Sequence, residues 1–167
     1  PNHIDKYARR GTEFHLWLEN HFKHPSLISM DDLFNQNSIS PVEEDAPLDK
    51  LQSAWLSSKW ANLNPVDVEV GFETMIDTTL IRGRIDAVYK LDADHYEVVD
   101  WKTGKVKSGD DLVNASIQLA MYRLAYAKLK NLPIEKISAA FHYVLDDQTV
   151  RPADILDENE LIKLVTQ

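Results

Sequence analysis

Hydrophobic residues recur at helical spacing over the first 22 residues. The residues at alternating steps of four and three are Ile4, Ala8, Gly11, His15, Leu18 and Phe22. Residues at these steps share one face of a helix, so the pattern predicts a helix over residues 2–22 with His15 on its inward stripe. The glycine on that stripe would let another backbone or a ligand approach closely.

The pattern changes twice before the first strand. Residues 24–47 contain three prolines among polar residues, which predicts a long surface connection with a short helical turn at residues 31–34. The acidic residues 43–45 are interpreted as a solvated charge run. Residues 48–61 are again helical in pattern, with Leu51, Trp55 and Leu56 expected to face inward.

Alternating apolar and polar residues then predict strands. Three of them, at residues 66–75, 79–91 and 95–101, are joined by short polar turns, which favours an antiparallel meander. A fourth strand is expected at residues 137–145, followed by a turn at Asp146 and Asp147. The pattern therefore predicts a mixed sheet of four strands.

Two further helices surround the fourth strand. Residues 111–131 are apolar on most sides, which predicts a deeply buried helix capped by Asp110 or Asp111. Residues 157–160 carry the pattern of a capping box that opens a final short helix. The order is helix, helix, three strands, helix, strand, helix, and the expected fold class is α/β (α+β), in one domain over residues 1–167.

Composition narrows the class of protein. The chain has 167 residues, contains no cysteine and carries a formal net charge of -9. Disulfides, thiolate zinc sites and iron–sulfur clusters are excluded for this sequence. The acidic charge argues against gripping nucleic acid by bulk electrostatics, so a neighbouring domain or partner is expected to supply basic surface. No apolar run is long enough to predict a membrane-spanning helix. A cytoplasmic location is expected.

Three residues in the strands suggest catalytic chemistry. Asp86 lies in the second strand, and Asp100 and Lys102 point the same way at the end of the third. Adjacent antiparallel strands can bring the two carboxylates together, where they repel each other unless a cation lies between them. A hard cation such as Mg²⁺ prefers such oxygen ligands, activates water and stabilises charge on a phosphate. The lysine could then stabilise negative charge in the transition state.

Each of these residues also has a structural interpretation. Asp100 and Lys102 could form only a surface ion pair. Arg84 could contact a phosphate or pair with Asp86, and His15 could be a core histidine. Gln118 and Tyr122, spaced i, i+4 on the long apolar helix, could be a satisfied core amide and a core tyrosine or could support the site. Trp101 is expected to anchor the strand on the opposite face. Paired acids also serve glycosidases, but the neighbouring lysine and histidine fit a metal nuclease better.

Four motifs in order resemble the PD-(D/E)XK nuclease superfamily, in its RecB-like branch. They are Gly11-Thr12-Glu13-Phe14-His15, Gly83-Arg84-Ile85-Asp86, Asp100-Trp101-Lys102-Thr103-Gly104 and Gln118-Leu119-Ala120-Met121-Tyr122. The proline of the superfamily name is absent, because Ile85 precedes Asp86. The cysteines of the iron–sulfur branch are absent as well.

The resemblance implies a restriction-endonuclease-like core and hydrolysis of DNA phosphodiester bonds with Mg²⁺ or Mn²⁺. It implies that His15, Asp86 and Asp100 hold metal and that Asp86, Asp100 and Lys102 form the catalytic set. Glu69 is the best match to a further acid on the preceding strand. Arg84, Gln118 and Tyr122 are implied as supporting residues.

RecB-like domains commonly end UvrD-type helicases, especially of the actinobacterial type, and the sequence begins with Pro1 rather than methionine. The expectation is therefore an exonuclease domain excised from a longer helicase, acting in DNA repair on single-stranded DNA. The alternative is a module of the same fold that guides DNA or braces a helicase without cleaving.

Overall fold

The computed structural model describes the backbone of residues 3–23 and 47–166, and the side chains of residues 10–23 and 47–166. The predicted turn at 31–34 and the acidic run at 43–45 lie outside the described residues. The helices are α1 (His3–Lys23), α3 (Leu48–Leu56), α4 (Gly109–Lys130) and α5 (Glu158–Val165), with short 3-10 turns η2 (Lys59–Asn62) and η3 (Ile134–Lys136). The strands are β1 (Asp67–Ile76), β2 (Thr79–Lys90), β3 (Tyr96–Lys102), β4 (Ile137–Tyr143) and β5 (Gln148–Val150).

The strands form one mixed sheet in the order β1-β2-β3-β4-β5. The first three make the predicted antiparallel meander. Strand β4 returns parallel to β3 after the crossover through α4, as a parallel neighbour requires. The α+β class with a mixed sheet flanked by helices is confirmed, but the sheet has five strands rather than four. The missed strand, β5, has only three residues and pairs antiparallel with the end of β4, so it carried too short a pattern to detect.

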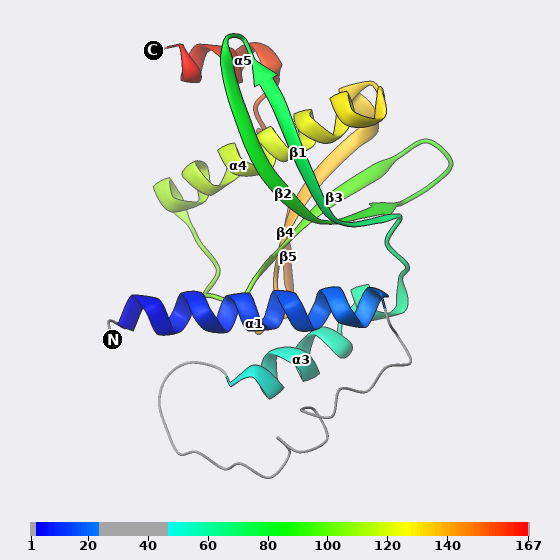
Figure 1. Ribbon diagram of the computed structural model, residues 1–167, viewed down its shortest axis with the longest axis vertical. Helices are drawn as coiled ribbons and strands as arrows, with labels where there is room; N and C mark the ends of the chain where they lie inside the picture. The colour runs from blue at the N-terminus through cyan, green and yellow to red at the C-terminus, as the bar shows by residue number, and fades with distance from the viewer. Residues whose placement is uncertain (1–2, 24–46, 167) are drawn as a thin grey trace.

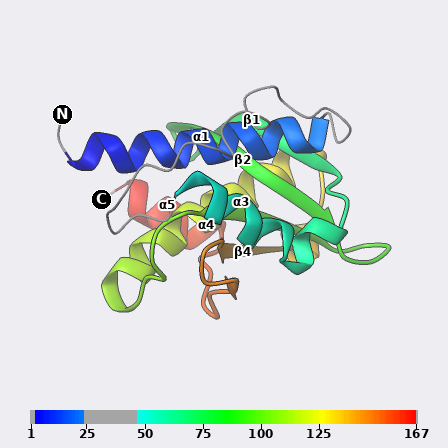
Figure 2. The same cartoon turned by 90° about the horizontal axis from the view of Figure 1, so that it is seen from below.

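Helices cover the two faces of the sheet with separate hydrophobic cores (Figure 1). Helix α4 packs on one face, where Leu119 and Tyr126 meet Val98 and Phe141. Helices α1 and α3 pack on the other face, and both views place α3 beside α1 (Figures 1 and 2). The predicted anchor Trp101 is 2% exposed in this second core. Successive residues of β3 therefore serve opposite layers, as strand alternation requires.

Several helix predictions need correction. On α1 the fully buried residue is Phe14, with Leu18 one turn later, and His15 lies at the border of that stripe. The predicted helix over 48–61 stops at Leu56, which is 48% exposed rather than inward, and η2 follows. Within η2, the Trp60 side chain is buried against the sheet. The positions of these helices could be predicted from their apolar residues. Which face of each helix is buried depends on the packing of the folded protein.

Helix α4 also departs from its prediction at its start. Its N-cap is Ser108, which makes no side-chain cap hydrogen bond, and Asp110 and Asp111 lie in the first turn instead. Burial is concentrated in the second half, whereas Val113 is 62% exposed. The capping box of α5 is confirmed by two reciprocal hydrogen bonds of 2.9 Å between Asp157 and Glu160.

The alternation of β1 and β2 breaks at one level of the sheet. Ile85 and Val88 both pack in the core under α4 although they are three residues apart, which simple alternation would place on opposite faces. On β1, Glu69 sits at the same level with a φ of 50°, a left-handed conformation that is uncommon for a residue with a side chain. The distortion turns the side chains of Glu69 and Asp86 toward α1. Beyond this distortion, the hairpin formed by β1 and β2 extends to α5 (Figure 1). There Ile76 of β1 packs with Leu161 of α5.

No helix in the described ranges is long and apolar enough to cross a membrane.

Candidate metal-binding site

Asp86 lies where β2 and β3 separate. The paired positions of these strands end at Ala87 and Val99, whereas β3 stays paired with β4 as far as Lys102 and Tyr143. Beyond that point the Trp101 backbone N–H does not pair with the backbone of β2. It donates instead to the Asp86 side chain, at 2.8 Å from Oδ2. The other oxygen, Oδ1, lies 3.4 Å from His15 Nδ1. The carboxylate of Asp86 is therefore held on one side by backbone and faces α1 on the other.

Helix α1 brings His15 to this carboxylate. Phe14 and Leu18 anchor the helix in the core, which leaves His15 at the edge with a side chain 30% exposed. One turn earlier, a Cβ built on Gly11 would lie 3.4 Å from Thr103 Oγ1, which is an ordinary van der Waals contact with the loop after β3. The structure therefore shows no backbone approach at Gly11 that requires a glycine, and the approach of a ligand there stays a prediction.

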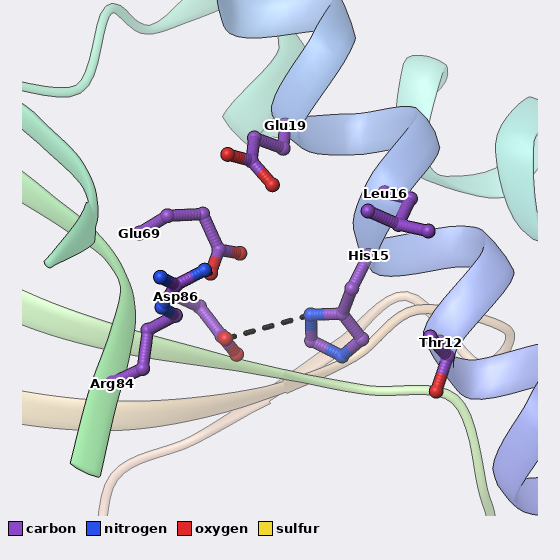
Figure 3. Close-up of a pocket in the computed structure, with 7 residues that line it drawn as sticks. All are labelled: Thr12, His15, Leu16, Glu19, Glu69, Arg84 and Asp86. Carbon is purple, nitrogen blue, oxygen red and sulfur yellow. Dashed lines mark ion pairs between the residues drawn. The ribbon is translucent and has the colours of Figure 1, made fainter. Parts of the chain in front are cut away.

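Glu69 completes a group of three possible ligands. Ligand atoms of His15, Glu69 and Asp86 all lie within 4.8 Å of one another. Together with Thr12, Leu16, Glu19 and Arg84, these residues line a pocket of about 280 Å³ (Figure 3). Histidine nitrogen and carboxylate oxygens from three different elements thus converge on one small space that a cation could occupy.

Asp100 and Lys102 lie beside this group, on the side toward α4. Asp100 is 6% exposed, and the Lys102 Nζ lies 2.9 Å from its Oδ2. The ion pair of the structural alternative is therefore present, but it is not at the surface, because the carboxylate is buried. The contact lacks the direction of a hydrogen bond, so this buried oxygen keeps unused acceptor capacity. The Asp86 carboxyl group is close enough to share a hydrogen bond with it.

The two carboxyl groups titrate differently because their neighbours differ. The pKa of Asp100 is raised to about 7 by burial, by the hydrogen bond with Asp86 and by the Asp86 charge. The positive charge of Lys102 opposes this increase. Burial also acts to raise the pKa of Asp86, but hydrogen bonds from His15, Asp100 and the Trp101 N–H lower it overall. The raised pKa of Asp100 and the lowered pKa of Asp86 therefore place a proton shared by the pair mainly on Asp100.

The other two groups of the site respond to the same crowding of negative charge. Burial alone would lower the pKa of His15, but its hydrogen bond to Asp86 and the surrounding carboxylates raise it. Burial and the charge of Asp86 raise the pKa of Glu69. The site is therefore short of positive charge, which is the condition that a bound cation relieves.

Helix α4 brings Gln118 and Tyr122, the two residues predicted to support the site, next to Lys102. Gln118 Oε1 lies 3.4 Å from Lys102 Nζ, and Gln118 Nε2 donates to the Tyr122 hydroxyl at 2.8 Å. Gln118 is exposed, so it is not the core amide of the structural alternative. Its side-chain oxygen contacts the lysine of the site instead. A Cβ on Gly83 would lie 2.7 Å from the Phe72 ring and 3.2 Å from that of Tyr122, so this glycine lets both rings pack there.

The structure separates the predicted residues into two adjoining groups. His15, Glu69 and Asp86 form the three-ligand group, and Asp100 joins it through Asp86 without being one of the three. The ion pair formed by Arg84 is with Glu69, at 3.7 Å, and not with Asp86 as one alternative had it. Sequence reasoning missed Glu19, which lines the pocket and pairs with Lys23. Its position one turn after His15 was the signal that could have found it.

The donor set fits a divalent cation. Carboxylate oxygens and one imidazole nitrogen suit Mg²⁺ or Mn²⁺, which accept oxygen ligands and retain waters. Asp100 does not line this pocket, and its Oδ2 faces the Lys102 ammonium at 2.9 Å. The chain has no cysteine, so an iron–sulfur cluster has no thiolate ligands here.

Comparison with known proteins agrees with this chemistry. A family model described as the PD-(D/E)XK nuclease superfamily matches residues 1–166. Among solved structures, the crystal structure of SSO0001 is similar, with 23% sequence identity and a TM-score of 0.44. The match covers 70% of this chain and 53% of that chain, so this chain spans about half the length of SSO0001. None of the curated proteins compared with the chain matches it.

Proposed function

Because the chain belongs to the PD-(D/E)XK nuclease superfamily, we propose that it hydrolyses DNA phosphodiester bonds with a divalent metal held by His15, Glu69, Asp86 and Asp100. One observation carries the proposal. Three ligand-bearing side chains from α1, β1 and β2 converge within 4.8 Å beside a buried carboxylate and a lysine. A structural role would not require three carboxyl groups, Glu69, Asp86 and Asp100, to be gathered in one place with so few cations.

Each residue has a part in this chemistry. A divalent ion in the pocket would activate a water and neutralise charge on a phosphate oxygen. His15, Glu69 and Asp86 hold their donor atoms toward the pocket, and Asp100 adds a carboxylate from the side of Lys102. The Lys102 ammonium can then stabilise negative charge on the reacting phosphate. Gln118 positions that ammonium, and the Tyr122 hydroxyl accepts from Gln118.

The choice of Mg²⁺ or Mn²⁺ and the DNA substrate form the finer part of the proposal. We propose that the chain is one nuclease domain, residues 1–167, of a longer helicase in DNA repair, and that it degrades single-stranded DNA delivered by the motor as an exonuclease. The net charge of -9 supports a partner in DNA binding, because phosphate contacts require basic residues. The four-motif resemblance to RecB-like domains supports the helicase context.

Calorimetry with Mn²⁺ and a cleavage assay with a labelled single-stranded oligonucleotide test the proposal together. The wild type should bind Mn²⁺ and cleave only when it is present. Asp86→Asn should lose both, because it removes the carboxylate shared by the ligand group and Asp100. Asp146→Asn, at the exposed turn between β4 and β5, is the matched control and should retain both.

Two results would contradict the assignment. Cleavage that survives in Asp86→Asn and in Lys102→Ala would show that the chemistry lies elsewhere. A folded wild type that binds no Mn²⁺ at millimolar concentration would instead favour the non-cleaving DNA-guiding module.

A further inference from the structure

Arg84 occupies an unusual position in the pocket. Its side chain is 62% exposed, yet it lies in the wall of the candidate metal site with its guanidinium beside the Glu69 carboxylate (Figure 3). The NH1 nitrogen lies 3.7 Å from Glu69 Oε2, whose side chain is only 12% exposed. An exposed cation therefore pairs with one of the proposed metal ligands.

A bound dication changes the electrostatics of that pair. Glu69 balanced by two positive charges attracts the guanidinium far less than a free carboxylate does. Arg84 would also face the dication itself across a pocket lined by the same residues. Since most of its side chain is exposed, Arg84 can turn away without losing much packing.

Phosphate is the partner that the released guanidinium would meet. The planar fork of arginine matches the oxygens of a phosphate, and its charge cannot be lost by deprotonation. A DNA strand whose scissile phosphate enters this pocket must carry a neighbouring phosphate past the pocket wall. Arg84 is one of the residues that line the pocket, and most of its side chain is exposed to solvent.

We infer that Arg84 exchanges partners, pairing with Glu69 in the metal-free pocket and with a DNA phosphate next to the scissile one once the cation is bound. This inference rests on the proposed metal-dependent nuclease function. It makes Arg84 a substrate-binding residue whose contribution to DNA binding depends on metal. The net acidic domain would thereby grip DNA only when the site is ready for cleavage.

The exchange predicts two effects of Arg84→Ala in opposite directions. Calorimetry should show Mn²⁺ binding about 2- to 10-fold tighter, because a cation that competes for Glu69 is gone. Binding of a nuclease-resistant phosphorothioate single strand, followed by anisotropy, should weaken about 3- to 10-fold with Mn²⁺ present. Without Mn²⁺ the same oligonucleotide should bind wild type and variant alike. With Mn²⁺, the salt slope of log K should fall by about 0.7, the loss of one phosphate contact on single-stranded DNA.

Arg82→Ala is the matched control. Arg82 lies two residues earlier on β2, is 71% exposed and pairs at 2.9 Å with Glu73, which does not line the pocket. Its substitution removes the same charge from the same strand. It should leave Mn²⁺ affinity unchanged, and any effect on DNA binding should be the same with and without Mn²⁺.

The outcomes separate the two proposals. If the wild type binds Mn²⁺ but Arg84→Ala weakens DNA binding equally with and without the metal, or not at all, the partner exchange is overturned and the nuclease proposal stands. If the wild type binds no Mn²⁺, both are overturned. Circular dichroism of each variant verifies that it is folded, and Arg84→Lys, which keeps the charge without the fork, should fall between wild type and Arg84→Ala.

Discussion

Strand β3 carries two buried acids that differ in how they are satisfied. Glu97 is 1% exposed and accepts two hydrogen bonds of 2.8 Å from Arg151 and one of 3.0 Å from Ser138. Asp100, three residues later and 6% exposed, lies against another carboxyl group and leaves one oxygen without a hydrogen bond. Burial alone therefore does not mark a functional acid, since Glu97 is buried more deeply.

The difference in partners is what separates structure from function. A buried charge is tolerated when an opposite charge and hydrogen bonds satisfy it, as Arg151 and Ser138 do for Glu97. Asp100 has one nearby cation, the Lys102 ammonium, and shares its hydrogen bond with a second acid, Asp86. An acid left short of partners costs stability, and a protein keeps such a cost where a ligand or a reaction requires it. Four predicted effects test this comparison, from the largest to the smallest.

The largest expected effect is on cleavage. Asp100→Asn should reduce metal-dependent DNA cleavage about 10³-fold or more, because it removes a charged ligand next to Lys102. Glu97→Gln, an equally conservative change on the same strand, should leave cleavage by the folded protein within about threefold. Initial rates on a labelled oligonucleotide measure both. Equal losses in the two variants would contradict the division of roles.

The second effect is on folding and concerns the satisfied acid. Arg151→Met should lower the free energy of unfolding by about 3 kcal/mol, because it leaves the Glu97 carboxylate buried without its cation. Urea denaturation measures the loss. Arg82→Met breaks the exposed pair with Glu73 and should cost less than about 1 kcal/mol. A loss from Arg151→Met as small as that would mean that Glu97 is not held by this pair.

The third effect is on the pH dependence of stability without metal. The Asp100 carboxyl group keeps its proton to about pH 7 in the folded protein, against an ordinary value of 3.8 in the unfolded chain. Between these values the folded state binds more protons, so stability falls as pH rises from about 4 to 7. Asp100→Asn should remove the part of this decline that Asp100 contributes and raise the free energy of unfolding by about 1–2 kcal/mol at pH 8. The raised pKa values of Glu69 and His15 should leave a smaller decline.

Urea denaturation in EDTA across this pH range is the measurement, with Asp146→Asn as a control that should keep the decline. If Asp100→Asn were destabilising at pH 8 and stabilising at pH 4, folding would lower the pKa of Asp100 instead of raising it.

The smallest effects come from the neutral neighbours of the two acids. Gln118→Ala should lower the cleavage rate about 3- to 10-fold with little change in stability, because it loosens the position of Lys102. Ser138→Ala should do the reverse, lowering the free energy of unfolding by about 1 kcal/mol with little change in cleavage. A pH–rate profile unchanged in shape in Gln118→Ala would agree with a positioning role. A cleavage loss from Ser138→Ala as large as that from Gln118→Ala would make the two acids equivalent.

Much of the secondary structure could be predicted because local pattern carries it. The four longer strands, the two long helices and the capping box of Asp157 and Glu160 follow from periodicity and end signals. The end of α3 at Leu56, the cap at Ser108 and the three-residue strand β5 were missed, since they depend on packing or are too short to show a period. The burial of Trp60 depends likewise on the sheet that it covers.

The sequence by itself determined the chemical types available and their order along the chain. His15, Asp86, Asp100 and Lys102 could be singled out because acids and a base at strand ends have few structural uses. Only the tertiary structure decided that Glu69 and not Asp100 completes the three-ligand group, and that Arg84 pairs with Glu69. Both depend on the left-handed turn of β1 at Glu69 and on the separation of β2 from β3. Both features are distortions of regular strands. The alternating sequence pattern predicts a strand but does not show where the strand departs from regular geometry.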